Sequence, residues 1–275
     1  MPEAPDLQVV REFLEPRLLG RRLVNAVEVR PLIVRNLVGR PLAADAAGRT
    51  VERLWRHGKL LFLALSDDRV IVVNPMLAGG LRYCPATDRV AASTFVRLGF
   101  DDGQEVRYFD TKKMGMVYYA TAEQARDVPR VEEQGPDILD QRLTLEQFKE
   151  RLRPYRGEIK GVLTRGGVVS GIGNAYADEI LFDARIFPFK KRTALSAAEI
   201  ASLHRSVYSV PERALAVLRR RMGADIHIKL RDFLAVHGRG GQLCPRCGHQ
   251  ISAITANQRE TNFCRRCQPG LLIRN

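Results

Sequence analysis

Four of the five cysteines lie near the end of the chain, in two closely spaced pairs. Cys244 and Cys247 form one pair, Cys264 and Cys267 the other, with 16 residues between them. Two such pairs can hold one tetrahedral zinc ion, and two disulfides are the alternative. Because the first residues lack the basic and apolar pattern of a secretion signal, we expect reduced thiols and one structural Zn2+ per chain. Four thiolates leave no open coordination position, so the chemistry must lie elsewhere.

The start of the sequence, Met1-Pro2-Glu3, is a candidate for that chemistry. Removal of Met1 would expose the secondary amine of Pro2, and an α-amine with a pKa of about 8 is a usable nucleophile at neutral pH. Such an amine can attack the C1′ carbon of a sugar and form an iminium ion, while the Glu3 carboxylate moves protons. Proline is also common at this position without such a role, so the pair alone does not decide the function.

Two glycines, Gly171 and Gly173, precede a segment of helical periodicity that begins near Asn174. Backbone N–H groups at a helix N-terminus bind phosphate, and Asn174 adds a side-chain donor; a tight turn between helices is the alternative. Arginines also surround the cysteines, and Arg259 falls between the two pairs, where a hairpin could present it to DNA phosphate. The others are Arg239, Arg246, Arg265 and Arg266.

The overall charge favours a polyanionic partner. The 275 residues contain 44 Lys and Arg against 31 Asp and Glu, a net charge of +13, and 45% of them are hydrophobic. This apolar content supports a folded core, and the basic excess is typical of nucleic-acid-binding proteins. The apolar run at 60–65 is far too short to span a bilayer. We therefore expect no membrane contact and an intracellular protein, cytoplasmic and nucleoid-associated or otherwise intracellular.

The periodicity changes along the chain and predicts several domains. We expect a β-rich N-terminal domain over 1–125, a linker over 126–140, a helical domain over 141–232 and the zinc module over 233–275. Predicted strands cover 51–54, 59–65, 70–73, 94–100 and 105–109, and predicted helices cover 6–19, 145–152, 159–164, 174–182, 197–205 and 210–221. Ser196 and Glu199 predict a capping box before the helix at 197. From about Phe233 we expect a strand-like segment that leads into the zinc module.

These features together closely resemble the formamidopyrimidine-DNA glycosylase / endonuclease VIII family of base-excision repair enzymes. The resemblance rests on the Pro2-Glu3 start, HGKLLF at 57–62, IKGVLTRGGVVSGIGNAYADEILF at 159–182, and HGRGGQLCPRCG with NQRETNFCRRCQ within 237–268. It implies an α+β multidomain fold, with an N-terminal β-sandwich flanked by helices, a helix–two-turn–helix domain and a C-terminal four-cysteine zinc finger. It also implies a bifunctional DNA glycosylase and AP lyase that excises oxidised or ring-opened bases and then performs β,δ-elimination.

The resemblance assigns roles to single residues. Pro2 would be the Schiff-base nucleophile and Glu3 the general acid/base. Lys59, in the HGKLLF segment, matches the family lysine that contacts DNA phosphate near the lesion, and Arg259 matches the zinc-finger arginine; we count both with the catalytic residues. The partner implied is double-stranded DNA with damaged bases or abasic sites, bound by a monomer.

Further residues match the DNA contacts of the family. Lys160 and Asn174 match phosphate contacts of the helical domain. Two segments match the wedge residues that fill the gap left by a flipped-out base, namely Met76-Leu77 and Lys112-Lys113-Met114. The second replaces an Arg-Arg-Phe run that is frequent in the family, so we expect a softer wedge and tolerance of the opposite base.

Residues 222–244 are too few for the loop that closes over a flipped oxidised purine in the formamidopyrimidine branch. We therefore expect an open pocket in which nothing in 223–243 grips the edge of 8-oxoguanine, and a preference for oxidised pyrimidines, ring-saturated or ring-opened bases and abasic sites. The alternatives are a catalytically inactive DNA-binding member of the same fold, and a zinc-ribbon protein of translation or transcription. The latter would leave the first 120 residues unexplained.

Overall fold

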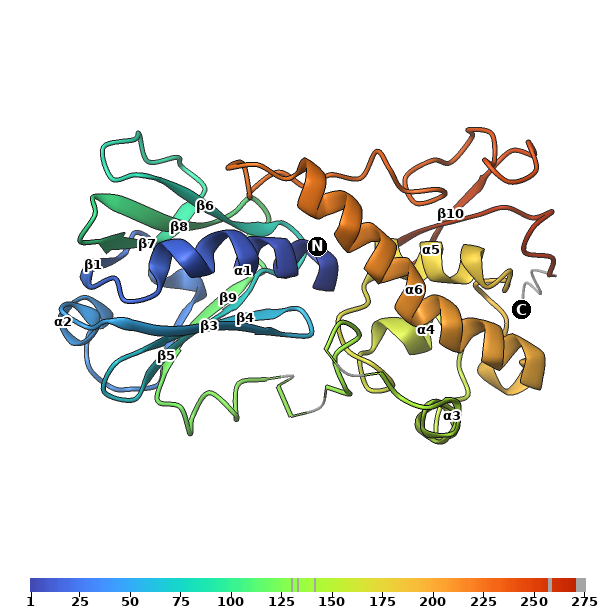
Figure 1. Cartoon of the computed structure of the whole chain (residues 1–275), viewed down its shortest axis with the longest axis horizontal. Coiled ribbons are helices and arrows are strands. Elements are labelled where there is room, and N and C mark those ends of the chain that lie inside the picture. The colour runs from blue at the N-terminus through green and yellow to red at the C-terminus, as the bar shows by residue number, and fades with distance from the viewer. Residues whose placement is uncertain (130, 133, 141, 257–258, 271–275) are drawn as a thin grey trace. The chain divides into compact units, whose positions relative to one another are not determined.

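The computed structural model describes residues 1–129, 131–132, 134–140, 142–256 and 259–270 (Figure 1). The chain divides into two compact units, the first made of 1–132 and 218–229 and the second of 133–217 and 230–275. We call residues 218–229 the return segment, because they pack with the N-terminal residues after the chain has passed through the second unit. Among the described residues, no helix is long and apolar enough to cross a membrane.

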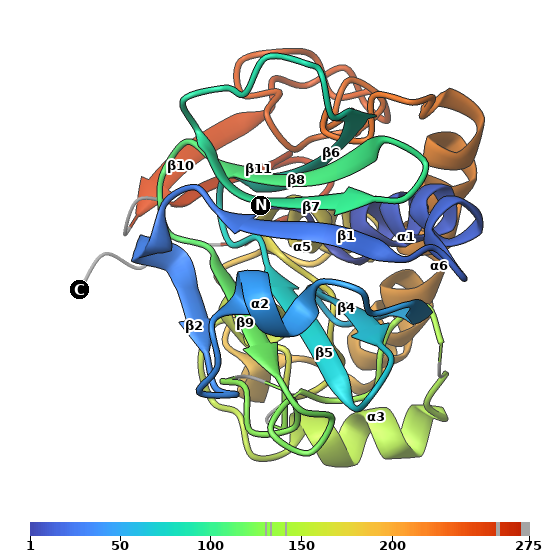
Figure 2. The same cartoon turned by 90° about the vertical axis from the view of Figure 1, so that its left-hand side faces the viewer.

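The first unit is a β-sandwich with a helix at its start. Helix α1 spans Ala4–Leu18, and two sheets follow, which Figure 2 shows as separate layers. One sheet has the order β1-β7-β8-β6, formed by Leu23–Glu28, Thr94–Phe100, Gln104–Asp110 and Gly79–Pro85. The other has the order β2-β9-β5-β4-β3, formed by Val34–Asn36, Met116–Ala120, Arg69–Asn74, Leu60–Leu65 and Val51–His57. Neighbouring strands are antiparallel except β2 and β9, which are parallel.

The sandwich is stabilised by apolar side chains that alternate along its strands. The main core joins both sheets and α1, whose Val10, Leu14 and Leu18 recur at helical spacing. The opposite face of β4 packs into a second cluster, in which Trp55 stacks on Phe62 with ring centroids 4.9 Å apart. Because both faces of β4 are buried, its sequence is apolar at every position and not alternating.

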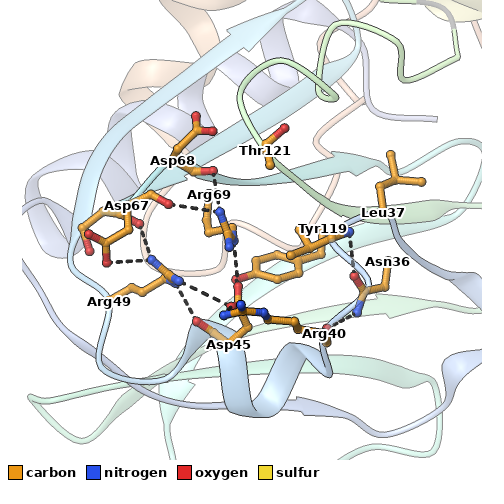
Figure 3. A network of polar contacts seen from close by, with 12 residues as sticks. Asn36, Leu37, Arg40, Asp45, Arg49, Asp67, Asp68, Arg69, Tyr119 and Thr121 are labelled. Carbon is orange, nitrogen blue, oxygen red and sulfur yellow. Dashed lines mark hydrogen bonds and ion pairs between the residues drawn. The ribbon is translucent and has the colours of Figure 1, made fainter.

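A polar network fastens the short helix α2, Leu42–Ala46, to the second sheet (Figure 3). The Asp45 carboxylate accepts hydrogen bonds from Arg69 Nε at 2.7 Å and from the Tyr119 hydroxyl at 2.6 Å, and the guanidinium of Arg49 lies 3.5 Å away. The hydrogen bond from Arg69 is the largest cause that lowers the pKa of Asp45 to about 2, and burial followed by Asp45 raises the pKa of Tyr119 to about 12. One buried carboxylate thus connects α2, β5 and β9.

The second unit contains the remaining helices and a hairpin, except that the last turn of α6, from residue 218, belongs to the return segment of the first unit. Helices α3, α4, α5 and α6 span Leu145–Leu152, Ile159–Thr164, Asn174–Asp183 and Ala197–Arg221, and the hairpin strands β10 and β11 span Ser252–Ala256 and Arg259–Phe263. Short 3-10 turns lie at Pro31–Ile33 in the first unit and at Arg192–Ala194 in the second. The predicted capping box before α6 is confirmed, because Ser196 N–H donates to Glu199 Oε2 at 2.8 Å and Glu199 N–H donates to Ser196 Oγ at 3.2 Å.

Two elements predicted for the second half of the chain differ from the structure. The helices predicted at 197–205 and 210–221 are one helix, α6, which runs through Pro211. Proline removes one backbone hydrogen bond, but buried residues at helical spacing on both sides of it, among them Val207 and Ala214, keep the helix continuous. No strand begins near Phe233, where the chain forms turns, since the zinc module takes its strands from β10 and β11.

Replacement of Asp45 by Asn should destabilise the first unit by about 2 kcal/mol at pH 7, because the charges of Arg69 and Arg49 lose their partner. The folded pKa lies below the ordinary value of 3.8, so this stabilisation is present above pH 4 and is lost as the pH falls through about 2. Urea unfolding followed by fluorescence of Trp55, the single tryptophan, measures the first unit directly.

The matched control is Asp67→Asn, because Asp67 also pairs with Arg49 but is 81% exposed and should contribute less than about 0.5 kcal/mol. Equal losses for the two variants at pH 7 would contradict this account. So would a difference between Asp45→Asn and the unmodified protein that stays constant from pH 7 to pH 3.

Candidate active site and zinc centre

Pro2 lies buried in a pocket of the first unit, where α1 begins. The pocket is lined mainly by apolar side chains from three parts of this unit: the start of α1, the inner strands of the sandwich and the return segment. The lining residues are Pro2, Asp6, Leu7, Val10, Leu61, Val73, Pro75, Gly80, Leu81, Met222, Ile226, His227, Ile228 and Lys229. The return segment forms part of the wall of this pocket, so residues within 223–243 lie next to Pro2. Whether any of them contacts an oxidised base stays a prediction.

Glu3 is 1% exposed and is held by a reciprocal capping box at the start of α1. Its carboxylate accepts a hydrogen bond from the backbone N–H of Asp6, and the Asp6 carboxylate accepts one from the backbone N–H of Glu3 at 2.8 Å. Pro5 in the first turn favours the same helical start. These contacts fix the backbone next to Pro2 and bury the Glu3 carboxylate.

Lys59 lies in the turn between β3 and β4. This turn is positioned by Arg56, a residue that no motif of the sequence singled out. Arg56 is 4% exposed, and its guanidinium donates to the Gly58 carbonyl oxygen at 2.9 Å and to Gln8 Oε1 at 3.2 Å. Gly58 has a φ of 56°, which favours glycine. Since Gln8 belongs to α1, Arg56 ties the turn that carries Lys59 to the helix that begins beside Pro2.

The loop that carries Lys112, Lys113 and Met114 is organised by one buried carboxylate. Asp110 accepts hydrogen bonds from the backbone N–H groups of Lys112, Met114 and Gly115 at 2.8, 2.9 and 2.7 Å. Lys113 has a left-handed φ of 56°, and the Met114 side chain remains 45% exposed. Asp110 therefore presents an exposed apolar side chain on an ordered loop.

The turn with Met76 and Leu77 comes close to the same loop through Tyr108. A Cβ atom on Gly79 would lie 2.2 Å from the Tyr108 hydroxyl oxygen, and one on Gly115 would lie 1.8 Å from it. Only glycine allows Tyr108 to pack between the two segments, and burial, followed by nearby Asp110, raises the pKa of Tyr108 above its ordinary value. Leu77 is 49% exposed, so each segment carries one exposed apolar side chain.

A fully buried aspartate organises the second unit. Asp178, on α5, lies 2.7 Å from Lys160 Nζ and 2.8 Å from His237 Nδ1, and it accepts a hydrogen bond from the Asn262 backbone N–H at 3.2 Å. The neighbouring Glu179 accepts hydrogen bonds from three consecutive backbone N–H groups, those of residues 235–237, at 2.8, 2.8 and 2.9 Å. Two adjacent carboxylates therefore join α4, α5, the segment before the zinc module and β11.

Three of the candidate DNA-binding residues are brought together at β11. Lys160 Nζ and Asn174 Nδ2 both donate to the backbone carbonyl of Glu260, at 3.1 and 2.8 Å, and Lys160 also donates to Thr261 Oγ1 at 2.8 Å. Arg259, adjacent to Glu260, is exposed at the start of β11. The structure places Lys160, which is 8% exposed, in a buried ion pair, while Arg259 faces solvent.

The four cysteines of the zinc module fit a zinc ion. Their Sγ atoms all lie within 4.8 Å of one another, with 3.9 Å between Cys244 and Cys267 and 3.5 Å between Cys247 and Cys264. These separations exceed a disulfide bond and match the edge of about 3.8 Å expected for a tetrahedron with Zn–S bonds of about 2.3 Å. Arg246, within the first pair, lies 4.1 Å over the Phe182 ring and anchors the module to α5.

Comparison with known proteins agrees with this arrangement. Three family models match: the formamidopyrimidine-DNA glycosylase N-terminal domain over 1–117, the formamidopyrimidine-DNA glycosylase H2TH domain over 134–223, and a zinc finger found in FPG and IleRS over 241–270. A formamidopyrimidine-DNA glycosylase of Symbiobacterium thermophilum is 34% identical over 98% of this chain and 90% of its own length. The chain belongs to the formamidopyrimidine-DNA glycosylase family.

Solved structures of the family extend the comparison to the fold. The complex of Lactococcus lactis Fpg with abasic-site DNA matches with a TM-score of 0.88 at 27% identity, over 98% of this chain and all of that one. MutM in complex with carbocyclic 8-oxo-G containing DNA matches with the same TM-score at 28% identity, again over 98% of this chain and all of that one. The predicted fold is confirmed. The family is one of DNA glycosylases with AP lyase activity, and this chain is an enzyme of that family. Its four cysteines hold one structural zinc.

Replacement of Cys264 by Ser should abolish zinc binding and remove hydrogen-exchange protection from β10 and β11, because thiolate ligation supplies the folding energy of this small module. The control Arg259→Ala should retain one zinc per chain, since Arg259 is exposed and is not a ligand. Elemental analysis of protein purified without added metal makes the measurement. Well below one zinc per chain in the unmodified protein would refute the site.

Replacement of Asp178 by Asn should destabilise the second unit by about 3 kcal/mol, because Lys160 is left buried without an opposite charge. Hydrogen exchange should accelerate in α4, α5 and β11 together, as the carboxylate contacts all three. The control is Glu146→Gln, which removes a surface pair with Lys149 from a side chain that is 78% exposed. If both variants exchange at the same rate, Asp178 does not organise this unit.

Proposed function

We propose that the protein excises oxidised or ring-opened bases from double-stranded DNA and then cleaves the abasic site, with the Pro2 amine as nucleophile. The observation that carries the proposal is the burial of Pro2 in an apolar pocket beside Glu3, a carboxylate that is 1% exposed. Family membership supplies the reaction class, a DNA glycosylase with AP lyase activity. The related structures hold DNA with an abasic site or with an 8-oxoguanine analogue, which supports damaged DNA as the partner.

The first chemical step exchanges one bond at C1′ for another. The lone pair of the Pro2 nitrogen forms a bond to C1′, and the glycosidic bond breaks with its electron pair on the departing base, which takes up a proton. The amine loses its proton, the C1′–O4′ bond opens to give a hydroxyl group, and an iminium ion remains. Glu3 is the group positioned to carry these protons. The reaction requires removal of Met1, whose peptide bond otherwise occupies the Pro2 nitrogen.

Elimination then completes the lyase reaction. The iminium ion acidifies the C2′ hydrogen, and its removal expels the 3′ phosphate; a second elimination expels the 5′ phosphate. Hydrolysis of the remaining imine returns the Pro2 amine. An apolar pocket suits this chemistry, because it favours a neutral amine over an ammonium ion.

The remaining candidate residues would hold the DNA. We assign Lys59 and Arg259 to phosphate contacts, with Lys160 and Asn174 as supports of the β11 backbone that carries Arg259. The exposed side chains of Leu77 and Met114, with Met76, Lys112 and Lys113 beside them, would occupy the space of the extruded base. Since the substrate is DNA, we place the enzyme in the compartment that contains the DNA.

Replacement of Pro2 by Gly should slow cleavage and borohydride trapping of an abasic-site duplex by about a hundredfold, and leave DNA binding intact, because the secondary amine is lost. Glu3→Gln should slow base excision more than abasic-site cleavage, since the departing base needs a proton. Single-turnover kinetics on duplexes with a lesion and with an abasic site separate the two steps.

The control for Glu3 is Glu15→Gln, a carboxylate of the same helix that pairs with Arg11 at 3.0 Å and should affect neither step. A protein with an uncleavable N-terminal tag should not be trapped. Trapping of the tagged protein at the full rate would show that Pro2 is not the nucleophile.

A further inference from the structure

The wall that the return segment adds to the Pro2 pocket is anchored in the first unit. Arg219 pairs with Glu12 of α1 through two contacts of 2.9 and 2.6 Å, and this hydrogen bonding lowers the pKa of Glu12. Ile226 is 4% exposed and belongs to the sandwich core, against which Met222 also packs. The residues that follow Ile226 therefore approach the pocket on an ordered backbone.

His227 is the feature of this wall that the chemistry above does not use. It lines the pocket, and its Nδ1 atom is shielded from solvent without a hydrogen-bond partner among the residues that the structure describes. The Asp225 carboxylate lies 4.0 Å from this nitrogen, which is too far for a hydrogen bond. Buried polar atoms in proteins are almost always hydrogen-bonded, so an unsatisfied one in a ligand pocket points to a partner on the ligand.

The imidazole ring is also held in place by its neighbours. The rings of His227 and Phe109 meet edge to face, with centroids 6.3 Å apart and an interplanar angle of 83°. Phe109 in turn lies against Gly80, where a Cβ atom would come within 2.7 Å of the Phe109 ring. Gly80 also lines the pocket, so Phe109 packs between a residue of the pocket wall and the His227 ring.

The other polar side chains that line the pocket have their own contacts. Asp6 is engaged in the capping box, and Lys229 Nζ donates to the Leu77 carbonyl oxygen at 3.4 Å. The rest of the lining is mainly apolar. A hydrogen bond between His227 and a ligand would therefore form in surroundings with few competing polar groups, where it contributes most to discrimination.

We propose that His227 is a specificity-determining residue that hydrogen-bonds the flipped base through Nδ1. This inference rests on the proposed function of the Pro2 pocket. An imidazole nitrogen can accept from a ring N–H group or donate to a carbonyl oxygen, and oxidised pyrimidines and ring-opened purines carry both groups. An abasic site carries neither, so His227 should act on the base and not on the sugar chemistry.

The test compares base-dependent and base-independent reactions of the full-length protein. His227→Phe keeps an aromatic ring against Phe109 but removes both nitrogens. It should slow single-turnover excision of 5-hydroxyuracil by about tenfold to a hundredfold, the effect of one lost hydrogen bond, and leave abasic-site cleavage within about twofold. His227→Asn, which returns an amide near the position of Nδ1, should recover part of the excision rate.

The control is Asp225→Asn, because Asp225 is 77% exposed and is the acid nearest to the ring. It should leave both rates unchanged. Equal slowing of excision and abasic-site cleavage by His227→Phe would overturn the inference, since it would indicate a structural role. No slowing of excision, or the same slowing by Asp225→Asn, would overturn it as well.

A binding measurement separates this inference from the proposed nucleophile. Duplexes with a carbocyclic lesion, which cannot be excised, and with a tetrahydrofuran site, which has no base, are compared with each variant. His227→Phe should lose about tenfold in affinity for the first and none for the second. The difference in affinity between the two duplexes tests the role of His227 even if the Pro2 variants show that another group forms the adduct. An equal loss of affinity for both duplexes would refute the proposed contact between His227 and the base.

Discussion

An α-amine can act as a nucleophile only if the end of the chain, ordinarily among the most mobile parts of a protein, is held in one position. The capping box between Glu3 and Asp6 provides this restraint, because it closes the first turn of α1 directly after Pro2. The apolar face of α1 then buries Leu14 and Leu18 in the sandwich core. The sandwich therefore holds α1, and with it Pro2, in one position. The turn that carries Lys59 is connected to the same helix through the hydrogen bonds of Arg56 with Gln8 and Gly58.

The second unit depends on the same kind of contact, a buried carboxylate with several partners. Asp178 balances Lys160 and His237, and Glu179 satisfies three backbone N–H groups. Leaving a buried charge unpaired costs several kcal/mol, so these partners constrain one another strongly. Together with the zinc centre, they fix β11 and the exposed Arg259 on a module that has little apolar core of its own.

The sequence predicted those parts of the structure that depend on local pattern. The cysteine spacing identified the zinc ligands. Helices α3 and α4 have the predicted bounds, since each is a short helix whose apolar positions repeat within a few neighbouring residues. Strands β1, β2, β6 and β9 were missed; β6 begins with two glycines, and β2 has only three residues. Helix α6 was predicted as two helices with a break at 206–209, since the packing that holds it together is not visible in a local pattern.

The parts of the site that were missed depend on contacts between distant residues. No local pattern places the return segment beside Pro2, so the part that Ile226 and His227 take in lining the pocket could not be predicted from the sequence. A signal did exist for the Asp178 network: the run NAYADEILF places two acids inside an otherwise apolar helix. Acids in such a helix are buried with it, and buried acids require partners.

The most direct test of the account is to locate the covalent adduct on the protein. The enzyme is trapped with borohydride on an abasic-site duplex, digested with trypsin, and the peptide that carries the sugar remnant is identified by mass spectrometry. The account predicts an adduct on the peptide that begins at Pro2 and ends at Arg11, with the modification on the proline nitrogen and with Met1 absent. An adduct on a lysine side chain, with the Pro2 peptide unmodified, would contradict it.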